Sequence, residues 1–486
     1  MNKEKLKIIV PIIYLLICLI ISFNRIPFWD EARAWLIAQN CNLLQLLDLM
    51  RLEGHTLLWF IVIAPFAKLN LFYPYSIYVI NAVFSFLAIF FMWKKAPFNI
   101  FEKSLITFGV PFLFLWGSVA RCYSIGILFI FLALSIYKER FEKPYWYLIF
   151  LVLAMNTSVL ALIGSFFLCL IFLFENLKNE NFKKLFVIFL CSCALILIQL
   201  FSFTPDYLRQ APEMAFLRDF LGYILMPIIY IPEYKIQSIL MSFLRISVVV
   251  GAITFLLYSF KNNRKILFFI LPTYFFMVIL FTKFYSGNFW HYFYFYLYFV
   301  CAMWILKAEN KGNIKFLNIC FVSILIMFMF KGSLFIDSKL TTINDSKSKF
   351  IAKEILSNPI YKDKKLFCLD PWSDVVPASL PYLSSVVIYD INNQDRKTFK
   401  SMRNQINFNL GKFDVEKFKE YLDKDSILLT NKAFFTHEYN NKINFVEKEN
   451  GEIVFIGKEV NISFIPLQSK PELKFWSYLI KVNKAL

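Results

Sequence analysis

Long apolar stretches separated by short polar segments fill the first two thirds of the chain. A helix needs about 20 residues to cross the hydrocarbon core of a bilayer, and these stretches approach that length. We therefore predict a polytopic α-helical membrane protein with about eleven transmembrane helices. The predicted spans are Leu6–Phe23, Tyr75–Trp93, Ser104–Val119, Cys122–Tyr137, Trp146–Met155, Ser158–Phe174, Leu185–Phe203, Ile239–Phe260, Ile266–Phe284, Phe289–Leu306 and Ile314–Phe330.

One shorter apolar run decides how these spans are oriented. The run His55–Leu69 is interrupted by Pro65 and Lys68, so it is too short to cross and is expected to lie in the membrane interface. Every strongly basic short loop then falls on the same side as the N-terminus. The positive-inside rule makes that side cytoplasmic.

This orientation divides the chain into two predicted domains. Residues 1–330 form a transmembrane domain with large outer loops at 24–74 and 204–235. Residues 331–486 follow an odd number of spans, so they are expected to form an extracytoplasmic domain. Strand-like runs alternate there with a helix-like stretch, which predicts a small soluble α/β fold. The expected helix is Val415–Leu422, and the expected strands are Leu366–Leu369, Val386–Tyr389, Ile427–Thr430 and Ile453–Ile456.

Composition supports this picture and excludes some functions. Apolar residues make up 58% of the chain, more than a water-soluble protein of this length could bury. The formal net charge of +18 fits basic cytoplasmic loops and a basic tail. No basic cluster is interleaved with aromatic residues, so we expect no nucleic-acid partner. The nine cysteines are scattered mostly within apolar segments, which argues against a disulfide framework.

The first outer loop carries the residues that suggest chemistry. It opens directly after the first span with two adjacent carboxylates, Asp30 and Glu31, which are followed by Arg33. We expect Asp30 to cap a helix that starts at Glu31. A second polar pair, Glu53 and His55, opens the interfacial segment.

These residues suit transfer of a sugar from a polyprenyl phosphate, because the bond that breaks lies at the headgroup plane of the membrane. The reaction needs a base for the acceptor proton, and Asp30 is placed for that task. It also needs cations to hold the departing phosphate and polar groups to bind the sugar. The candidate substrate-binding residues, all on the predicted outer side, are Arg33, His55, Arg121, Tyr123, Lys283 and His291.

The carboxylates also have structural explanations. Asp30 can serve only as an N-cap, and Glu31 can be solvated or paired with Arg33. Glu53 and His55 could instead ligate a divalent metal, although two residues do not make a metal site. No other cofactor is indicated.

The outer-side cations and aromatic residues have equally ordinary explanations. Arg121 and Tyr123 at a helix end can simply anchor the bilayer surface. Lys283 can extend its ammonium group to the interface, and His291 lies within an aromatic run typical of interfaces.

The order of these features resembles the GT-C superfamily of membrane glycosyltransferases. Its members include protein O-mannosyltransferases and the bacterial aminoarabinose transferases that modify lipid A. The resemblance covers roughly residues 1–140 and rests on Trp29–Arg33, on Glu53–His55 with Leu58–Trp59, and on the turn Val119–Tyr123. The chain departs from the family at Thr56-Leu57, where many members carry two prolines. It also has Ser124 where an acidic residue is frequent, which argues against a metal-dependent mechanism.

The resemblance implies an enzyme that transfers a sugar from a polyprenyl-phosphate donor to a glycan, lipid or protein acceptor. The reaction would take place on the outer face of a bacterial inner membrane, among membrane lipids. Asp30 would be the catalytic carboxylate, with Glu31 beside it, and Glu53 would be a second acidic residue of the site.

Two other functions remain open. A transporter or flippase for lipid-linked saccharides would require ionisable groups at mid-bilayer depth, and the spans offer little beyond Asn81, Gln199 and Arg245. A glycan polymerase would be expected to carry arginine-rich outer loops, whereas the second outer loop holds only the cations Arg209, Arg218 and Lys235.

Overall fold

The computed structural model describes most of the apolar region and the core of the tail. The described residues are 3–25, 27–53, 55–200, 258, 263–284, 289–309, 315, 317–326, 329, 348–369, 379–383, 388–390, 395–396, 426–430, 445–456, 460–470 and 475–484. The chain divides into two compact units. The first comprises Met1–Asn24, Leu43–Val62 and Tyr75–Leu340, and the second comprises Arg25–Asn42, Ile63–Pro74 and Thr341–Leu486.

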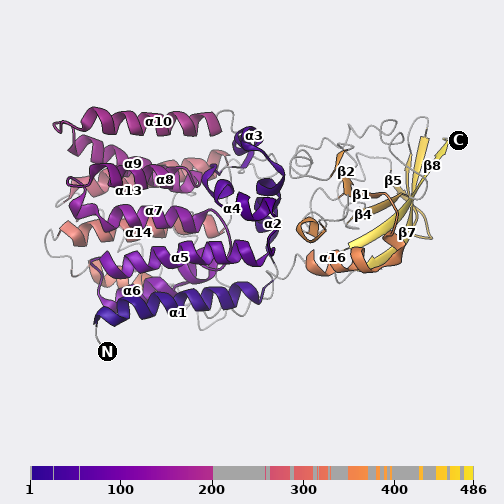
Figure 1. The fold of residues 1–486 in the computed structure, drawn as a ribbon, viewed down its shortest axis with the longest axis horizontal. Coiled ribbons are helices and arrows are strands. Elements are labelled where there is room, and N and C mark those ends of the chain that lie inside the picture. Colours follow the sequence, from indigo (N-terminus) through magenta and orange to yellow (C-terminus); the bar gives the residue numbers. More distant parts are fainter. Residues whose placement is uncertain are drawn as a thin grey trace. The chain divides into compact units, whose positions relative to one another are not determined.

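The first unit is a bundle of helices whose long axes run side by side and alternate in direction (Figure 1). Helix α5 packs against α1 and α7, and α8 packs against α7 and α9. Helix α13 packs against α9 and α14. The helices are α1 (Lys3–Phe23), α3 (Leu43–Glu53), α4 (Leu58–Lys68, shared with the second unit), α5 (Tyr75–Lys95), α6 (Ile100–Phe108), η1 (Pro111–Trp116), α7 (Tyr123–Ser135), η2 (Tyr137–Glu139), α8 (Pro144–Met155), α9 (Val159–Glu175), α10 (Phe182–Leu200), α13 (Arg264–Ile279), η4 (Leu280–Phe284) and α14 (Phe289–Glu309).

Four helices within the described part of the chain are long and apolar enough to cross a membrane: Glu4–Phe23, Tyr75–Lys95, Phe182–Leu200 and Arg264–Phe284. Their outward faces are apolar. On α1, Ile8, Ile12, Leu16 and Ile20 form a stripe in which each residue is between 43% and 61% exposed. Such a stripe is unfavourable in water, whereas lipid chains solvate it without cost. The bundle is therefore built to lie in a membrane.

The described parts of the predicted spans are mostly helical. The span expected at Ser104–Val119 falls on α6 and on the π-helix η1, which are separated at Gly109 and Val110. Apart from residue 258, the span expected at Ile239–Phe260 lies outside the described residues, as does the outer loop 204–235. The last expected span, Ile314–Phe330, is described only in part, including a short apolar helix at Leu317–Ile326.

Close helix contacts in the bundle depend on small residues. A Cβ atom on Gly164 of α9 would lie 2.1 Å from Cε1 of Tyr298 on α14. The Tyr298 ring is fully buried, and its hydroxyl donates to the carbonyl oxygen of Leu160 at 2.6 Å. This glycine therefore lets an aromatic ring of α14 lie directly against the α9 backbone.

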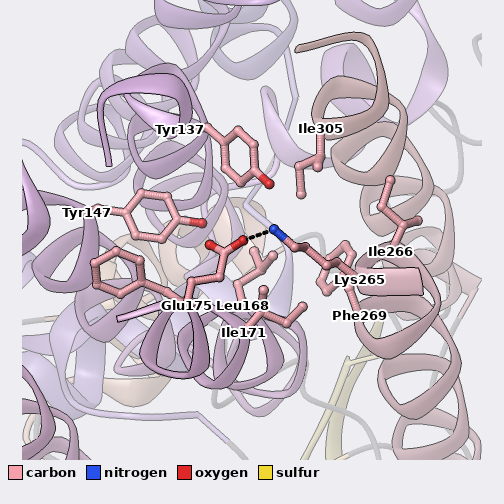
Figure 2. Close-up of a pocket in the computed structure, with 10 residues that line it drawn as sticks. Tyr137, Tyr147, Leu168, Ile171, Glu175, Lys265, Ile266, Phe269 and Ile305 are labelled. Carbon is pink, nitrogen blue, oxygen red and sulfur yellow. Dashed lines mark hydrogen bonds and ion pairs between the residues drawn. The ribbon is translucent and has the colours of Figure 1, made fainter. Parts of the chain in front are cut away.

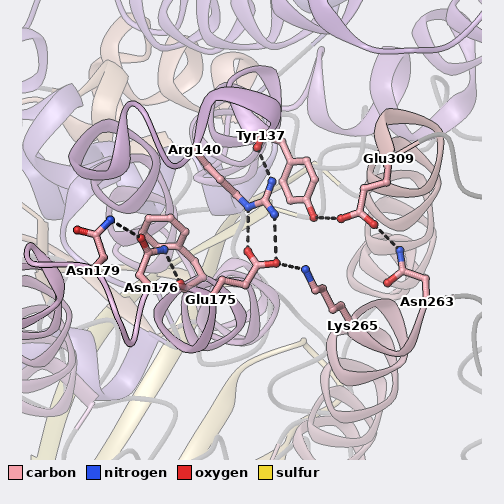
Figure 3. A network of polar contacts seen from close by, with 9 residues as sticks. Tyr137, Arg140, Glu175, Asn176, Asn179, Asn263, Lys265 and Glu309 are labelled. Carbon is pink, nitrogen blue, oxygen red and sulfur yellow. Dashed lines mark hydrogen bonds and ion pairs between the residues drawn. The ribbon is translucent and has the colours of Figure 1, made fainter.

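An ion-pair network joins the helix ends at one end of the bundle (Figure 3). Arg140 donates from Nε and Nη2 to the Glu175 carboxylate at 2.9 and 3.1 Å, and Lys265 also pairs with Glu175. The Tyr137 hydroxyl donates to Glu309 at 2.7 Å. These residues come from the α7–α8 connection, the end of α9, the start of α13 and the end of α14.

Asn263 extends the network by donating to Glu309 at 2.7 Å. A separate ion pair lies at the same end of the bundle, where Lys307 donates to Glu102 at 2.7 Å. Lys95 lies 4.0 Å from Glu139. We call this end of the bundle the basic end, defined by Lys95, Arg140, Lys143, Lys265 and Lys307. The loops that the sequence predicted to share one side of the membrane thus meet at one end of the bundle.

The second unit is built around a sheet of eight described strands in the order β3-β2-β1-β4-β8-β7-β6-β5. Strand β1 is parallel to β2 and β4, and the other pairs are antiparallel. The strands are β1 (Leu366–Leu369), β2 (Ile388–Asp390), β3 (Asp395–Arg396), β4 (Ile427–Thr430), β5 (Phe445–Glu447), β6 (Ile453–Ile456), β7 (Val460–Lys470) and β8 (Phe475–Lys484).

Three of the expected strands have the predicted bounds, namely β1, β4 and β6. Strand β2 overlaps the expected strand Val386–Tyr389, whose first two residues lie outside the described residues. The sequence did not predict the long β7–β8 pair, nor β3 and β5. The expected helix Val415–Leu422 lies outside the described residues.

Helices on the second unit are short. They are α2 (Trp29–Asn40), α16 (Ser348–Ser357), η6 (Pro359–Tyr361) and η7 (Leu380–Tyr382). Both α2 and α16 contact η7. The rings of Tyr73 and Tyr382 meet edge to face with centroids 5.1 Å apart, so part of the first loop packs with the tail.

One carboxylate fastens α16 to the sheet. Glu354 accepts from Lys470, from Asn358 at 2.9 Å and from Gln468 at 2.8 Å. The hydrogen bonds from Lys470 and Asn358 lower the pKa of Glu354 to about 2. The carboxylate therefore helps to hold α16 against β7 whenever it is ionised.

We expect Gly164→Ala to lower the stability of the bundle by about 1–3 kcal/mol, because the added methyl group displaces Tyr298 and breaks its hydrogen bond. Thermal unfolding in detergent measures this effect. The double variant Gly164→Ala with Tyr298→Leu removes the clashing ring and should recover part of the loss. An unchanged midpoint for Gly164→Ala would show that α9 and α14 are not in this contact.

We expect Glu354→Gln to destabilise the tail by about 1 kcal/mol at neutral pH, the low end for charged hydrogen bonds at a partly solvated site. The folded pKa lies below the usual unfolded value of about 4.3, so the stabilisation is present above that value and is lost as pH falls towards 2. Hydrogen exchange of β7 in the intact protein should show a difference between wild type and variant that shrinks below about pH 4. A pH-independent difference would contradict the role of the charge.

Candidate functional site

The connection between α3 and α4 is held by polar groups of two other helices. His55 forms an isolated antiparallel bridge with Ser158 at the start of α9. The amide of Leu57 donates to Oε1 of Gln199 at 2.8 Å, and the amide of Leu58 donates to the carbonyl oxygen of Asn156 at 3.1 Å. Gln199 also donates to the Asn156 side chain at 3.2 Å. Because buried backbone groups must be paired, these bonds fix the conformation in which His55 is presented.

A second irregular segment, Gly117–Cys122, is held by Asn81 of α5. Nδ2 of Asn81 donates to the carbonyl oxygens of Trp116 and Gly117 at 3.1 and 3.0 Å. Its Oδ1 accepts from the Ser124 hydroxyl at 2.7 Å. Asn81 is 1% exposed. It therefore satisfies the carbonyl groups that the end of η1 leaves unpaired and fixes the turn that precedes α7.

These two segments bring together side chains that lie far apart in the sequence. Nη2 of Arg121 lies 2.8 Å from Nε2 of His55, and Sγ of Cys122 lies 3.4 Å from Nδ1 of the same ring. The Tyr123 hydroxyl lies 2.8 Å from Nε2 of His291 at the start of α14. We call His55, Arg121, Cys122, Tyr123 and His291 the histidine–arginine cluster.

Aromatic contacts connect the two halves of the cluster. The guanidinium carbon of Arg121 lies 5.8 Å from the centroid of the Tyr123 ring. The rings of His55 and His291 each meet Tyr123 edge to face, at 6.0 and 5.9 Å. The Tyr123 ring is thus the common neighbour of Arg121, His55 and His291.

The contact with Arg121 defines the protonation of His55. A guanidinium group only donates hydrogen bonds, so Nε2 of His55 accepts and carries no proton. His55 therefore orients Arg121 by accepting one of its hydrogen bonds.

The cluster lies at the end of the bundle opposite to the basic end. Helix α7 begins at Tyr123 and leads to Tyr137, and α14 begins beside His291 and ends at Glu309. Tyr137 and Glu309 belong to the network at the basic end. Each helix therefore runs from the cluster to the basic end.

The predicted residues of α2 are in the second unit. Helix α2 begins at Trp29, with Phe28 as its N-cap, so the expectation that Asp30 caps a helix starting at Glu31 is wrong. Glu31 is fully buried and pairs with Arg25 through both carboxylate oxygens. It also accepts from the Phe28 amide at 2.7 Å. Glu31 therefore has a structural function, because its carboxylate holds Arg25 and the Phe28 amide at the start of α2.

The remaining candidates occupy varied positions. Asp30 and Arg33 are half-buried in the first turns of α2, and Glu53 is half-buried at the end of α3. Lys283 is exposed in η4, and among the described residues no contact joins it to the cluster. No three histidine, cysteine or acidic side chains within the described part of the chain gather closely enough to hold a metal ion.

Cys122, Asn81, Asn156 and Gln199 are the parts of the site that the sequence did not indicate. The only signal was a polar residue within an apolar stretch, and that signal does not tell a transport group from a structural one. The contacts of Asn81 and Gln199 with backbone groups show a structural use.

A small cavity of about 10 Å³, with room for about one water molecule, lies at the basic end (Figure 2). The hydroxyl groups of Tyr137 and Tyr147 point into it, and the ion pair of Lys265 with Glu175 closes one side. Most of its other lining residues are apolar, such as Leu168 and Phe269. Because its charged groups are already paired within the network, we assign it to the packing of α9 against α13.

We expect Asn81→Leu to loosen the Gly117–Cys122 turn, because two carbonyl groups lose their donor. Alkylation of Cys122 by N-ethylmaleimide, quantified by mass spectrometry, measures this effect, since Cys122 is fully buried in the wild type. The reaction should be at least about fivefold faster in the variant, as expected when a loss of 1–3 kcal/mol acts on local opening. Cys169, also fully buried, serves as the control and should stay protected. Equal protection of Cys122 in both proteins would contradict the role of Asn81.

No family model, no curated protein and no solved structure matches this chain.

Proposed function

We propose that the chain is a membrane glycosyltransferase that transfers a sugar from a polyprenyl-phosphate donor to an acceptor at the outer face of a bacterial inner membrane. The observation that carries the proposal is the histidine–arginine cluster at the end of the bundle opposite to the basic end. In this proposal the bundle has eleven spans, its N-terminus is cytoplasmic and its C-terminal domain is extracytoplasmic.

The orientation follows from the charge at the two ends of the bundle. Lys and Arg residues are retained on the cytoplasmic side of a membrane, so the basic end is assigned to the cytoplasm. The cluster then lies at the outer surface, at the depth of lipid phosphates. A lipid-linked donor presents its phosphate at that depth and leaves its chain in the hydrocarbon core.

The chemistry of the cluster suits a phosphate and a sugar. Arg121 would hold the phosphate through charge-assisted hydrogen bonds, oriented by the neutral ring of His55. Tyr123 and His291 are able to donate to or accept from sugar hydroxyl groups. The arginine also neutralises the charge that appears on the phosphate as the sugar leaves.

The general base is assigned from the sequence resemblance alone, which points to Asp30. Asp30 would take the proton of the acceptor hydroxyl as its oxygen attacks the anomeric carbon, and the bond from that carbon to the phosphate oxygen breaks. Glu53 would be a second acidic group, and Arg33 a further cation. Glu31 is not proposed to react, because its carboxylate is engaged with Arg25.

The transporter alternative has weaker support. Its candidates at mid-bilayer depth included Asn81 and Gln199, and both hold backbone groups of neighbouring segments. Arg245 and the second outer loop, on which the polymerase alternative depends, lie outside the described residues.

We expect Asp30→Asn to abolish transfer, because removal of a general base costs about 10²–10⁴-fold in rate. The gene is deleted in its host, and surface glycans and lipids are compared by mass spectrometry with strains that express the wild type or a variant. The glycan change caused by the deletion should be restored by the wild type and by the control Glu449→Gln, but not by Asp30→Asn. Restoration by Asp30→Asn at equal protein abundance would remove the assignment of Asp30.

We expect Arg121→Lys to weaken binding of the donor phosphate while leaving the protein folded. An ammonium group does not reproduce the two parallel hydrogen bonds of a guanidinium group. In membranes supplied with extracted lipid-linked sugars, the donor concentration for half-maximal rate should rise at least about tenfold. An unchanged donor dependence would place the phosphate elsewhere.

A further inference from the structure

Helix α16 presents an unusual face to solvent. Its buried residues are Ser348, Ile351, Ala352 and Ile355, which are at most 5% exposed and pack towards the rest of the unit. At 100° per residue, the exposed residues Lys349, Phe350, Lys353 and Leu356 occupy one continuous arc on the opposite side. Phe350 and Leu356 are each 54% exposed. Single exposed apolar residues are common, whereas two that flank a pair of lysines are a pattern of helices at membrane surfaces.

The charge on this face is entirely positive. The helix contains one acidic residue, Glu354, which is turned to the sheet and bonded to Lys470 and Gln468. Lys349 and Lys353 are therefore not neutralised by a carboxylate of their own helix. The face attracts an anionic surface, and its apolar borders favour partial removal from water.

Connectivity places this region near a bilayer. Helix α16 contacts η7, and Tyr382 of η7 contacts Tyr73 with ring centroids 5.1 Å apart. Tyr73 precedes by two residues the start of α5, a helix able to cross a membrane. Since consecutive Cα atoms are about 3.8 Å apart, the Tyr73 backbone lies within about 8 Å of the point where α5 enters the bilayer.

The neighbouring loop is also apolar on its exposed side. Leu69 and Phe72, in the same unit, are 70% and 79% exposed. These side chains suit the interfacial layer of a membrane better than bulk water.

We propose that α16 lies on the leaflet at which α5 begins and binds anionic phospholipids there. Lys349 and Lys353 contact lipid phosphates, and Phe350 and Leu356 enter the interfacial layer. The tail is thereby held against the membrane by a surface contact in addition to its covalent link. This inference is independent of the enzymatic activity proposed above.

Spin labels on the full-length protein in nanodiscs test the inference. A label at Phe350→Cys is compared with a label at Glu449→Cys, in the exposed turn between β5 and β6, in a background with the other cysteines replaced. In phosphatidylglycerol nanodiscs the label at 350 should be more accessible to oxygen than to a water-soluble nickel chelate, and the label at 449 should show the reverse.

A second experiment reverses the charge of the two lysines on α16. Each lysine near an anionic surface contributes about a fivefold gain in binding, so Lys349→Glu with Lys353→Glu should lower the docking constant at least about 25-fold and expose the label at 350 to nickel. The matched control Lys362→Glu with Lys481→Glu reverses two exposed lysines of the same unit and should leave the label in place. Nickel accessibility at 350 in the wild type would overturn the inference. So would a label that both reagents fail to reach, since it would be covered by protein, or a label unmoved by the α16 charge reversal.

Discussion

The arrangement of the candidate site depends on one constraint: polar backbone groups inside an apolar bundle must find partners within the protein. Two irregular segments interrupt the helices at one end of the bundle, and each leaves amide or carbonyl groups without helical partners. Asn81 pairs with the carbonyl groups of Trp116 and Gly117, and Gln199 pairs with the amide of Leu57. These two buried amide side chains fix the segments that carry Arg121 and His55. The contact of Arg121 with His55 is a consequence of that pairing.

The charged side chains have different partners at the two ends of the bundle. Carboxylates and cations of the loops pair with each other at the basic end, where Glu175 receives both Arg140 and Lys265. At the other end the cation of Arg121 is met by a neutral imidazole and an aromatic ring. The guanidinium fork of Arg121, oriented by His55, suits the geometry of a phosphate, and we therefore assign phosphate binding to the cluster. The cavity at the basic end is lined by the ion pair of Lys265 with Glu175, and we assign it to packing.

Much of the fold was predictable from the sequence because apolar length and strand patterning are local signals. Most of the long helices of the bundle fall within the predicted apolar stretches, and β1, β4 and β6 were found from runs of aliphatic residues. Strands β7 and β8 were missed because polar residues and Pro466, at a register shift, interrupt their alternation. Their stability comes from pairing with each other over their whole length, which is a non-local property.

The candidate site was predictable in its residue types but not in its contacts. His55, Arg121, Tyr123 and His291 were selected for their chemistry on the outer side, and the structure places all four in one cluster. The partner of Glu31 was not predictable, since Arg33 is nearer in sequence than Arg25, yet the carboxylate pairs with Arg25 and accepts from the Phe28 amide. The sequence did not indicate Cys122 as part of the site. Its place there depends on a contact between its sulfur and Nδ1 of His55, which lies 67 residues earlier in the chain.

The account stands on the claim that the end of the bundle bearing the cluster faces the outside of the cell. Labelling of intact cells with a membrane-impermeant maleimide tests it, with single cysteines at Asp30 and, as the opposite-side control, at Lys143. The account predicts reaction at position 30 in intact cells and at position 143 only after the membrane is opened. Reaction at 143 from outside, with position 30 protected until lysis, would contradict it.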